Sequence, residues 1–301
     1  MHVLVTGASG WIGSAVVPEL LDAGHEVTGL ARSDAAAAAI EAAGARVHRG
    51  SLDDLDGLRD AAAASDGVIH LAFKHEIAFA GDFAGAVEAD RRAVEALGEA
   101  LVGSDRPLVV AGGILGITAD RVATERDAAA PDGPGAVRDA IGRSAIAFAS
   151  RGVRSSVVRL APSVHGEGDH GFVAVLVGIA RARGVAGYVG DGAQRWPGVH
   201  RADAANLLRR ALEGAPAGSV LHAVADEGVP LRAVAEVIGR HLDVPVVAVA
   251  PEDAGEHFGF LAGFLAADSP ASSALTRELT GWRPTHPGLL EDLDKGHYFD
   301  A

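Results

Sequence analysis

The feature that most constrains this chain is a glycine-rich turn directly after its first apolar run. His2–Thr6 has the pattern of a strand, and Gly7, Gly10 and Gly13 follow before an apolar helical segment. The first glycine would allow a tight turn, the second would let backbone N–H groups approach a pyrophosphate, and the third would let the helix pack on the strand. The positive end of the helix also favours phosphate. The turn therefore predicts a dinucleotide site that includes Ser9, Trp11 and Ile12 besides the glycines.

Short apolar runs alternate with helical segments through the first half of the chain. We expect strands at residues 26–30, 46–48, 67–71, 108–111 and 155–160, with helices between them. This alternation predicts βαβ units and a parallel sheet, and the continuous apolar runs indicate that both sheet faces are covered. Residues 220–223 could return to the sheet as a last strand.

The pattern loosens after about Pro162, which predicts a smaller lobe over the carboxyl ends of the strands, where ligands bind in such sheets. We expect a dinucleotide-binding domain at residues 1–162, with residues 198–225 returning to it. Residues 163–197 and 226–301 would form a substrate-binding lobe. Helical segments are expected there at residues 231–241, 251–267 and 272–280.

Composition excludes several classes of function. The net charge of −14 argues against a nucleic-acid partner, and the absence of cysteine excludes disulfides, thiolate metal sites and a cysteine nucleophile. No uncharged apolar run reaches the ~20 residues of a membrane helix, and no export signal is found. We therefore expect a cytoplasmic protein that acts on a small molecule without a membrane partner. A metal site at His165, Asp169 and His170 would match no standard ligand spacing, so no metal is expected.

Four further segments follow the glycine-rich turn in order: VIHLA at 68–72, RLAPSVHG at 159–166, GDG and VHRADAA within 190–205, and GWRP at 281–284. Together with T-G-x-x-G-x-x-G, they resemble the extended and atypical short-chain dehydrogenase/reductase superfamily, particularly NAD-dependent epimerase/dehydratases. The resemblance covers nearly the whole chain. It implies a doubly wound Rossmann sheet of about seven parallel strands with a smaller C-terminal substrate lobe. It further implies cofactor contacts at His70, Leu71, Ala72 and Pro162, although His70 could equally be a core histidine. The two longest helices of the first half could form a homodimer, as in related proteins.

The end of the second strand favours NADP(H) over NAD(H). NAD-preferring proteins place a carboxylate there to bind the ribose 2′-hydroxyl, whereas this chain has Arg32 and Ser33, which suit a 2′-phosphate. The alternative is that Arg32 only extends into solvent from a strand end. After the third strand, Ser51 and Leu52 occupy the segment that contacts adenine in the family, where the resemblance would place an acidic residue.

The catalytic Tyr-x-x-x-Lys pair of the resembled family has no match. The chain has two tyrosines, Tyr188 and Tyr298, and neither is followed by lysine four residues later. One alignment of the expected helix at residues 137–151 places the tyrosine position near Arg138 and the lysine position near Gly142. Another places the two positions at Ile141 and Ala145. The cofactor site of the family can therefore be carried over, but its tyrosine-based proton transfer cannot.

Other titratable side chains near the expected sheet edge could replace that pair. His75 could act as a general acid, and Lys74 could grip a ribose or stabilise an oxyanion. His165, in place of the family's tyrosine in V-Y-G, is a second candidate acid. Predicted substrate contacts are Asp169, His170, Arg195 and Trp196. The alternatives are a solvated charge cluster around His75, a surface loop at residues 165–170, and a core position for Trp196.

The helix expected at residues 82–102 contains a carboxylate on its apolar side. Phe83, Val87, Val94, Leu97 and Leu101 define one stripe, and Asp90 falls in a gap of that stripe. Its side chain should point inward, where a carboxylate needs a partner. The resemblance implies an active-site support role for this position, and the alternative is a structural ion pair with an arginine.

These observations favour an NADP(H)-dependent oxidoreductase that transfers hydride to or from a small carbonyl, imine or activated alkene. His75, His165 and Lys74 are its candidate catalytic residues. One alternative is a non-redox sugar-nucleotide epimerase or dehydratase. Another is a non-catalytic NADP(H)-binding regulatory protein, which would need no replacement for the missing pair.

Overall fold

The computed structural model describes residues 1–118, 121–133 and 135–300. Its larger half is a sheet of seven parallel strands in the spatial order β10-β6-β5-β4-β1-β2-β3, which confirms the predicted fold. The strands are β1 (His2–Thr6), β2 (Glu26–Ala31), β3 (Arg46–Arg49), β4 (Gly67–His70), β5 (Pro107–Gly113), β6 (Arg154–Leu160) and β10 (Ser219–Ala223). The segment at residues 220–223 does return to this sheet, as its outermost strand beside β6.

Helices cover both faces of this sheet, which explains the unbroken apolar strands. One face packs against α1 (Gly13–Asp22), α2 (Asp34–Ala42) and α8 (Arg201–Gly214). The other packs against α3 (Leu55–Ala63), α5 (Phe83–Leu101) and α6 (Ala136–Ala147), which a 3₁₀ turn, η1 (Phe148–Arg151), extends. A short helix, α4 (His75–Phe79), follows β4 and contacts α5.

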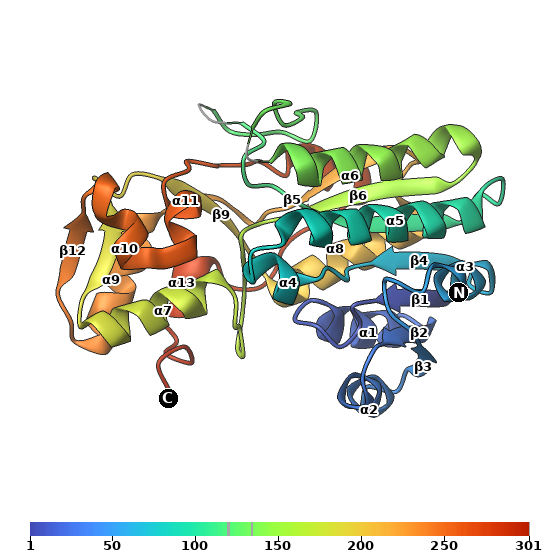
Figure 1. Cartoon of the computed structure of the whole chain (residues 1–301), viewed down its shortest axis with the longest axis horizontal. Coiled ribbons are helices and arrows are strands. Elements are labelled where there is room, and N and C mark those ends of the chain that lie inside the picture. The colour runs from blue at the N-terminus through green and yellow to red at the C-terminus, as the bar shows by residue number, and fades with distance from the viewer. Residues whose placement is uncertain (119–120, 134, 301) are drawn as a thin grey trace.

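The second lobe lies at one end of the long axis, beyond the sheet half (Figure 1). It contains a three-stranded sheet in the order β11-β9-β7 and a two-stranded sheet of β12 and β8. These strands are β7 (Ser163–His165), β8 (Ala186–Val189), β9 (Arg195–His200), β11 (Asp226–Pro230) and β12 (Val246–Val249). The larger helices around them are α7 (Phe172–Arg183) and α9 (Leu231–Leu242).

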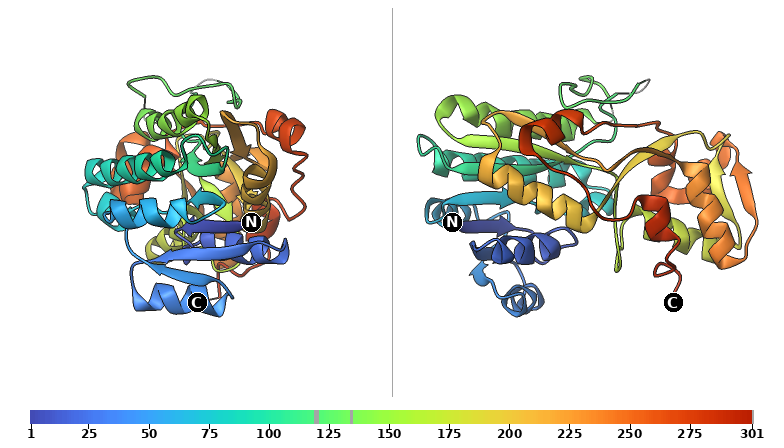
Figure 2. Two further views of the ribbon diagram at one scale, coloured as in Figure 1. Left: turned by 90° about the vertical axis from the view of Figure 1, so that its right-hand side faces the viewer. Right: turned by 180° about the vertical axis from the view of Figure 1, so that it is seen from behind.

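The segment expected to be helical at residues 251–267 is divided into four short pieces: η2 (Pro251–Asp253), α10 (Ala254–Phe258), η3 (Gly259–Leu261) and α11 (Ala262–Leu265). Gly259 has a φ of +58°, which ends α10 because a right-handed helix needs negative φ. The chain then runs back along the sheet half, where α12 (Ala274–Thr280) contacts β10, and returns to the second lobe at α13 (Leu289–Leu293) (Figure 2).

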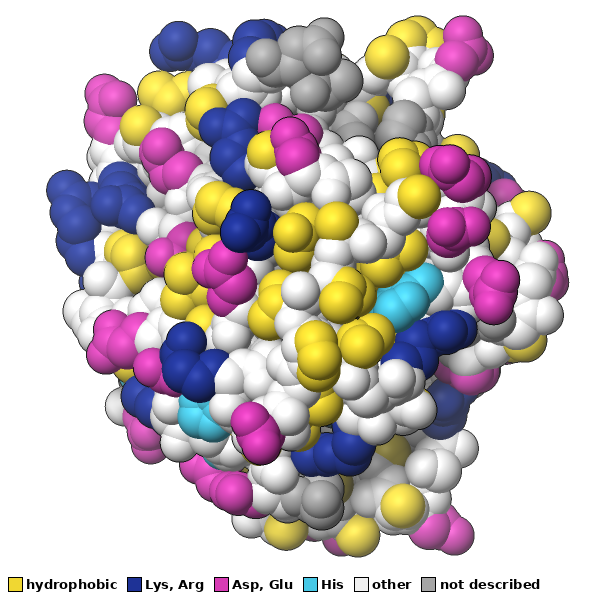
Figure 3. Space-filling view, turned by 90° about the vertical axis from the view of Figure 1, so that its left-hand side faces the viewer, with side chains coloured by type: hydrophobic (Ala, Val, Ile, Leu, Met, Phe, Trp, Pro, Cys, Tyr) yellow, Lys and Arg dark blue, Asp and Glu magenta, His cyan; other side chains and the backbone are white. Residues whose placement is uncertain are grey.

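The two halves have separate apolar cores, and the C-terminal segment contributes to both of them. Trp282 is fully buried against the sheet half, whereas Leu289 is buried in the second lobe. On the outer end of the second lobe, hydrophobic side chains gather among charged ones (Figure 3). Within the described ranges, no helix has the length and apolarity needed to cross a membrane.

Candidate cofactor and active site

The glycine-rich turn joins β1 to α1 with the geometry that its sequence predicts. Gly7 has a φ of +68°, and a Cβ on it would lie 2.8 Å from the Ala72 nitrogen in the loop after β4. A Cβ on Gly13 would lie 2.0 Å from the Gly7 carbonyl oxygen. No side chain caps the N-terminus of α1, and an uncapped helix N-terminus favours phosphate. The turn fits the diphosphate of a dinucleotide.

The position of this turn in the sheet also fits a dinucleotide site. β1 has β4 on one side and β2 on the other, and the chain order reverses at this point. In such sheets, ligands bind in the crevice outside the carboxyl ends of the strands at the reversal. The ends of β2 and β3 would therefore contact the adenosine part of a dinucleotide. The ends of β4 and β5 would contact its other nucleoside, which carries the reactive ring.

At the end of β2, the two predicted phosphate contacts are already engaged within the protein. The exposed Arg32 guanidinium is hydrogen-bonded to the carboxylate of Glu76 on α4, which lowers the pKa of that carboxyl. The Ser33 hydroxyl caps α2 by accepting a bond of 3.2 Å from the Ala36 amide. The Arg32–Glu76 pair is exposed and easily broken, so Arg32 remains accessible to an anion.

The end of β3 and the start of α4 are joined by an ion pair. The Lys74 ammonium lies 2.6 Å from Asp53 Oδ2, and the Asp53 amide donates to the Ser51 hydroxyl. Leu52 is buried in the core of the sheet half. Lys74 is therefore held on the side of the site where adenosine is expected. This placement suits a grip on the cofactor better than contact with a reacting carbonyl.

A buried chain of hydrogen bonds runs from β1 across β4 to the helices. Thr6 Oγ1 lies 2.7 Å from His70 Nδ1, and His70 Nε2 lies 2.9 Å from Asp90 Oδ1. Thr6 Oγ1 also accepts from the amides of Leu71 and Ala72. Because an ionised carboxylate only accepts hydrogen bonds, His70 Nε2 donates to Asp90. The core interpretation of His70 fits this arrangement.

The chain of hydrogen bonds ends at Arg138 on α6. Its Nη1 donates to Asp90 Oδ2 over 2.6 Å, and its guanidinium carbon lies 4.3 Å from the centre of the Phe73 ring. Asp90 thus has both proposed features, since it points inward and pairs with an arginine. One sequence signal pointed to Arg138, its place near the family's tyrosine position, but that signal carried no role for it.

His75, one of the predicted acids, lies beside this arginine. Its ring packs edge-on against Phe73, with ring centres 5.0 Å apart. Burial lowers the pKa of His75, and the positive charge of Arg138 lowers it further, while Glu76 and Asp90 oppose the change. A lowered pKa makes the protonated ring a readier proton donor but reduces its population at neutral pH.

His165, the other predicted acid, is enclosed in the second lobe. It is fully buried on β7, with Nδ1 3.0 Å from the Asp292 carboxylate and its ring 5.6 Å from the His200 ring. Burial alone would raise the pKa of Asp292, but the hydrogen bond with His165 and the nearby histidines lower it overall. Burial, together with the neighbouring His286 and His165, lowers the pKa of His200 to about 4. This enclosure removes His165 from the open sheet edge where a substrate could reach it.

The loop between β7 and α7 reaches the glycine-rich turn. The Trp11 indole donates to the Val164 carbonyl over 2.7 Å, and its ring lies 5.7 Å from the His170 ring in an edge-on arrangement. Asp169 accepts a bond of 2.9 Å from the Tyr298 hydroxyl, and burial raises the pKa of Asp169. The structure thus brings Trp11 and His170 together. It also adds Tyr298, whose contact across 129 residues of sequence no local pattern could show.

The other two predicted substrate contacts, Arg195 and Trp196, form hydrogen bonds within the second lobe. Arg195 forms two bonds to the Asp268 carboxylate, of 3.0 and 2.7 Å. Trp196 is 1% exposed and donates to the Phe264 carbonyl, so it belongs to the core rather than to a substrate wall. Among the described residues, no group of three His, Asp or Glu side chains is arranged to hold a metal ion.

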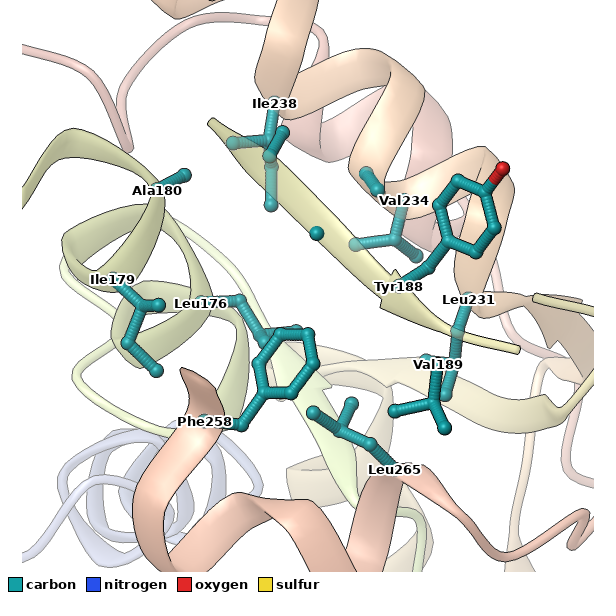
Figure 4. A pocket seen from close by; sticks show the side chains of 13 residues that line it. Leu176, Ile179, Ala180, Tyr188, Val189, Leu231, Val234, Ile238, Phe258 and Leu265 are labelled. Atoms are coloured by element: carbon teal, nitrogen blue, oxygen red, sulfur yellow. The ribbon is translucent and has the colours of Figure 1, made fainter. Parts of the chain in front are cut away.

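An apolar pocket lies within the second lobe, away from the glycine-rich turn. Figure 4 shows Leu176 of α7, Phe258 of α10 and Val234 of α9 around it, with the Tyr188 hydroxyl turned outward. Its lining is formed almost wholly by aliphatic and aromatic carbon, which offers no group for proton or hydride chemistry. Lys74 and His75 instead lie at the sheet edge, after β4.

Comparisons with known proteins agree with this geometry. A Schizosaccharomyces pombe protein described as uncharacterized is 46% identical over 300 residues, covering 99% of this chain and 100% of that protein. A Saccharomyces cerevisiae protein, also described as uncharacterized, is 45% identical over 97% of this chain and 98% of its own. Both relatives match at full length, so the second lobe is shared as well as the sheet half.

Solved structures show the same architecture. MoeE5 in complex with UDP-glucuronic acid and NAD is 26% identical, with a TM-score of 0.76 over 97% of this chain and 96% of its own. UDP-glucose 4-epimerase from Thermotoga maritima is 20% identical, with a TM-score of 0.79 over 99% and 98%, which shows the fold alone. The model of the NAD dependent epimerase/dehydratase family matches residues 3–222. The chain belongs to the NAD dependent epimerase/dehydratase family.

Proposed function

We propose that this protein is an NADP(H)-dependent oxidoreductase that transfers hydride to or from a small carbonyl compound, imine or activated alkene. The observation that carries the proposal is the composition of the sheet edge. The glycine-rich turn fits a dinucleotide, and Arg32 stands at the end of β2 in place of a carboxylate. The titratable His75 follows the end of β4.

Different residues at the sheet edge would bind different parts of the cofactor. The amides of the glycine-rich turn would bind the diphosphate, and Arg32, released from Glu76, would pair with the 2′-phosphate. Ser51 and Leu52 would border the adenine, and Lys74 would hold a ribose from its place beside Asp53. The bound cofactor would supply or accept hydride.

His75 is the proton donor in this proposal. It follows β4 at the carboxyl edge of the sheet, and its ring contacts Phe73. The enclosed His165 would instead fix the β7 loop through Asp292. That loop closes against Trp11, which would exclude water from one side of the cofactor.

The test measures binding and turnover separately. NADPH and NADH are titrated by nicotinamide fluorescence, and net oxidation is then followed with aldehydes, ketones, quinones and activated alkenes. We expect tighter binding of NADPH and substrate-dependent oxidation that His75→Gln reduces at least tenfold, while His165→Gln changes it less. NADPH binding with no turnover of any compound would contradict the proposal and favour a regulatory protein.

A sugar-nucleotide epimerase is the second candidate, because the similar MoeE5 structure holds UDP-glucuronic acid and NAD. Such an enzyme returns the hydride in each turnover, so it would retain NAD and show no net change in reduced cofactor. Isomerisation of a UDP-sugar by the purified protein, without net oxidation, would establish this candidate and contradict ours.

A further inference from the structure

We propose that the Arg138 guanidinium binds the carbonyl oxygen of the substrate and stabilises the oxyanion that forms there. This inference rests on the proposed hydride transfer and adds its electrophilic residue. Arginine retains its proton throughout the accessible pH range, so Arg138 would stabilise negative charge without donating a proton. That division leaves proton donation to His75.

Arg138 lies where the reacting end of a dinucleotide would be. Its guanidinium covers Phe73 of the loop after β4, and it lines a pocket between α6 and the strands β5, β6 and β10, which includes Gly112 and Gly113 at the carboxyl end of β5. β4 and β5 are neighbouring strands on the side of the reversal away from β2, whose end carries Arg32. Adenosine at β2 and β3 therefore places the nicotinamide end near Arg138.

Part of the guanidinium is available to a ligand. Among the described residues its hydrogen-bond acceptor is Asp90, which uses Nη1, and the side chain is 27% exposed. Arginine carries five N–H donors in a planar fork, so Nη2 and Nε can serve a carbonyl oxygen. Phe73 and Asp90 hold the guanidinium from two sides, which fixes the direction of its remaining N–H donors.

The surrounding charges favour a transient oxyanion over a permanently charged substrate group. Asp90 balances the charge of Arg138, and its other carboxylate oxygen binds His70, whose second ring nitrogen lies 2.7 Å from Thr6 Oγ1. A near-neutral pair acts as a fixed dipole, and preorganised donors of this kind stabilise charge that develops during the reaction. Thr6, His70 and Asp90 are thus positioning residues, linking the arginine to the residue that precedes Gly7.

The reductive step balances in atoms and electrons. A bound reduced nicotinamide would supply hydride to the carbonyl carbon, and the carbon–oxygen π pair would move to oxygen. Arg138 holds the resulting alkoxide, and protonated His75 then gives it a proton, so that an alcohol and the oxidised nicotinamide remain. His75 regains its proton from solvent.

A spectroscopic probe tests this role without turnover. 4-Nitrophenol absorbs differently as phenol and phenolate, and the phenolate oxygen resembles the proposed oxyanion. With the full-length protein and saturating NADP⁺, we expect the bound probe to ionise about one pH unit or more below its solution value. Arg138→Gln should abolish the shift, and Arg138→Lys should retain part of it. Arg151→Gln, which removes an exposed guanidinium paired with Glu99 at the end of the same helical segment, should leave the shift intact.

Kinetics provide the second readout. Loss of one oxyanion donor lowers kcat by about 10²–10³-fold with a smaller effect on KM, and we expect this pattern for Arg138→Gln. NADPH binding and the thermal unfolding midpoint are measured on each variant, and the Lys variant keeps the charge if the Gln variant does not fold. An unshifted probe on the wild type, failure of the wild type to bind it, or an unchanged shift in Arg138→Gln would overturn the inference. Intact NADPH binding and oxidation would then still support the proposed function.

Discussion

Asp90 of α5 and Arg138 of α6 form an ion pair in which the carboxylate is almost wholly buried and the guanidinium reaches the surface. Arg138 Nη1 lies 2.6 Å from Asp90 Oδ2, and the side chains of Asp90 and Arg138 are 3% and 27% exposed, respectively. The second carboxylate oxygen of Asp90 binds His70 of β4. The pair therefore joins two helices to the central sheet and directs an arginine to the sheet edge.

Replacing Asp90 by Asn should destabilise the protein by about 3–5 kcal/mol, the range for breaking one partner of a buried pair. The amide cannot accept from both His70 and Arg138, so one donor loses its acceptor. Urea unfolding measures the change. Glu88→Gln on the same helix disrupts only the exposed pair with Arg91 and should have a much smaller effect. Equal losses from both variants would refute the structural importance of the Asp90 pair.

Arg32→Ala should weaken NADPH binding about tenfold or more and leave NADH binding nearly unchanged. The reason is that a charge-assisted hydrogen bond contributes roughly 1.5–3 kcal/mol, and only NADPH carries the 2′-phosphate. Fluorescence titration of both cofactors provides the comparison. Arg46→Ala, an exposed arginine at the opposite end of the neighbouring strand β3, is the matched control. A parallel loss for both cofactors in Arg32→Ala would exclude 2′-phosphate recognition.

Reductive activity should be highest at acidic pH. His75 must be protonated to act as an acid, and burial and Arg138 hold the pKa of His75 below its ordinary value of 6.5. The rate constant kcat/KM should therefore fall tenfold per pH unit above that lowered pKa. Removing the positive charge in Arg138→Gln should raise the pKa of His75, which proton NMR of the His75 ring measures directly. A flat profile in the wild type would remove His75 from the proposed role.

The sheet half could be predicted because its signals are local: a turn with three glycines, apolar strands and helices of matching length. The inward direction of Asp90 also followed from helical spacing, but its partners did not, since His70 and Arg138 lie 20 and 48 residues away. The same stripe placed Phe83 inside, whereas it is 48% exposed at the start of α5. Helical periodicity indicates a face, and only tertiary packing decides how far that face is covered.

The second lobe was harder to predict because its key contacts join distant segments. Trp196 and Arg195 have sequence features that suit either a core or a binding wall, and the positions of Phe264 and Asp268 decide the matter. His165 likewise depends on Asp292, 127 residues away. One of two alignments placed the tyrosine position near Arg138 and the other placed it at Ile141, and the orientation of Arg138 depends on the distant Asp90 and Phe73.

Acid should destabilise the protein through His222 of β10. Its Nδ1 donates to the Ser272 carbonyl, its Nε2 faces Arg159, and burial lowers its pKa to about 4 from 6.5. The unfolded chain then binds a proton that the folded chain does not. Stability from this group is therefore complete above pH 6.5 and falls by roughly 3 kcal/mol as pH drops to about 4.

The measurement for His222 is the pH dependence of the unfolding free energy. His222→Asn should flatten the acid slope even if its overall stability is lower, because the titrating ring is gone. His241→Asn, which removes a histidine paired with the exposed Asp294 on the outside of the second lobe, is the control and should change the slope much less. An unchanged slope in His222→Asn would assign the acid sensitivity to other groups.

The most direct test of the central claim follows a labelled hydride. The protein is incubated with NADPH deuterated at nicotinamide C4 and with a carbonyl compound that it reduces, and the product is analysed by mass spectrometry. We expect one deuterium on the former carbonyl carbon, one NADP⁺ per product, and loss of both in the Arg138→Gln and His75→Gln variants. Retention of all deuterium on the cofactor, with no net NADP⁺ formed from any carbonyl compound, would contradict the proposed hydride transfer.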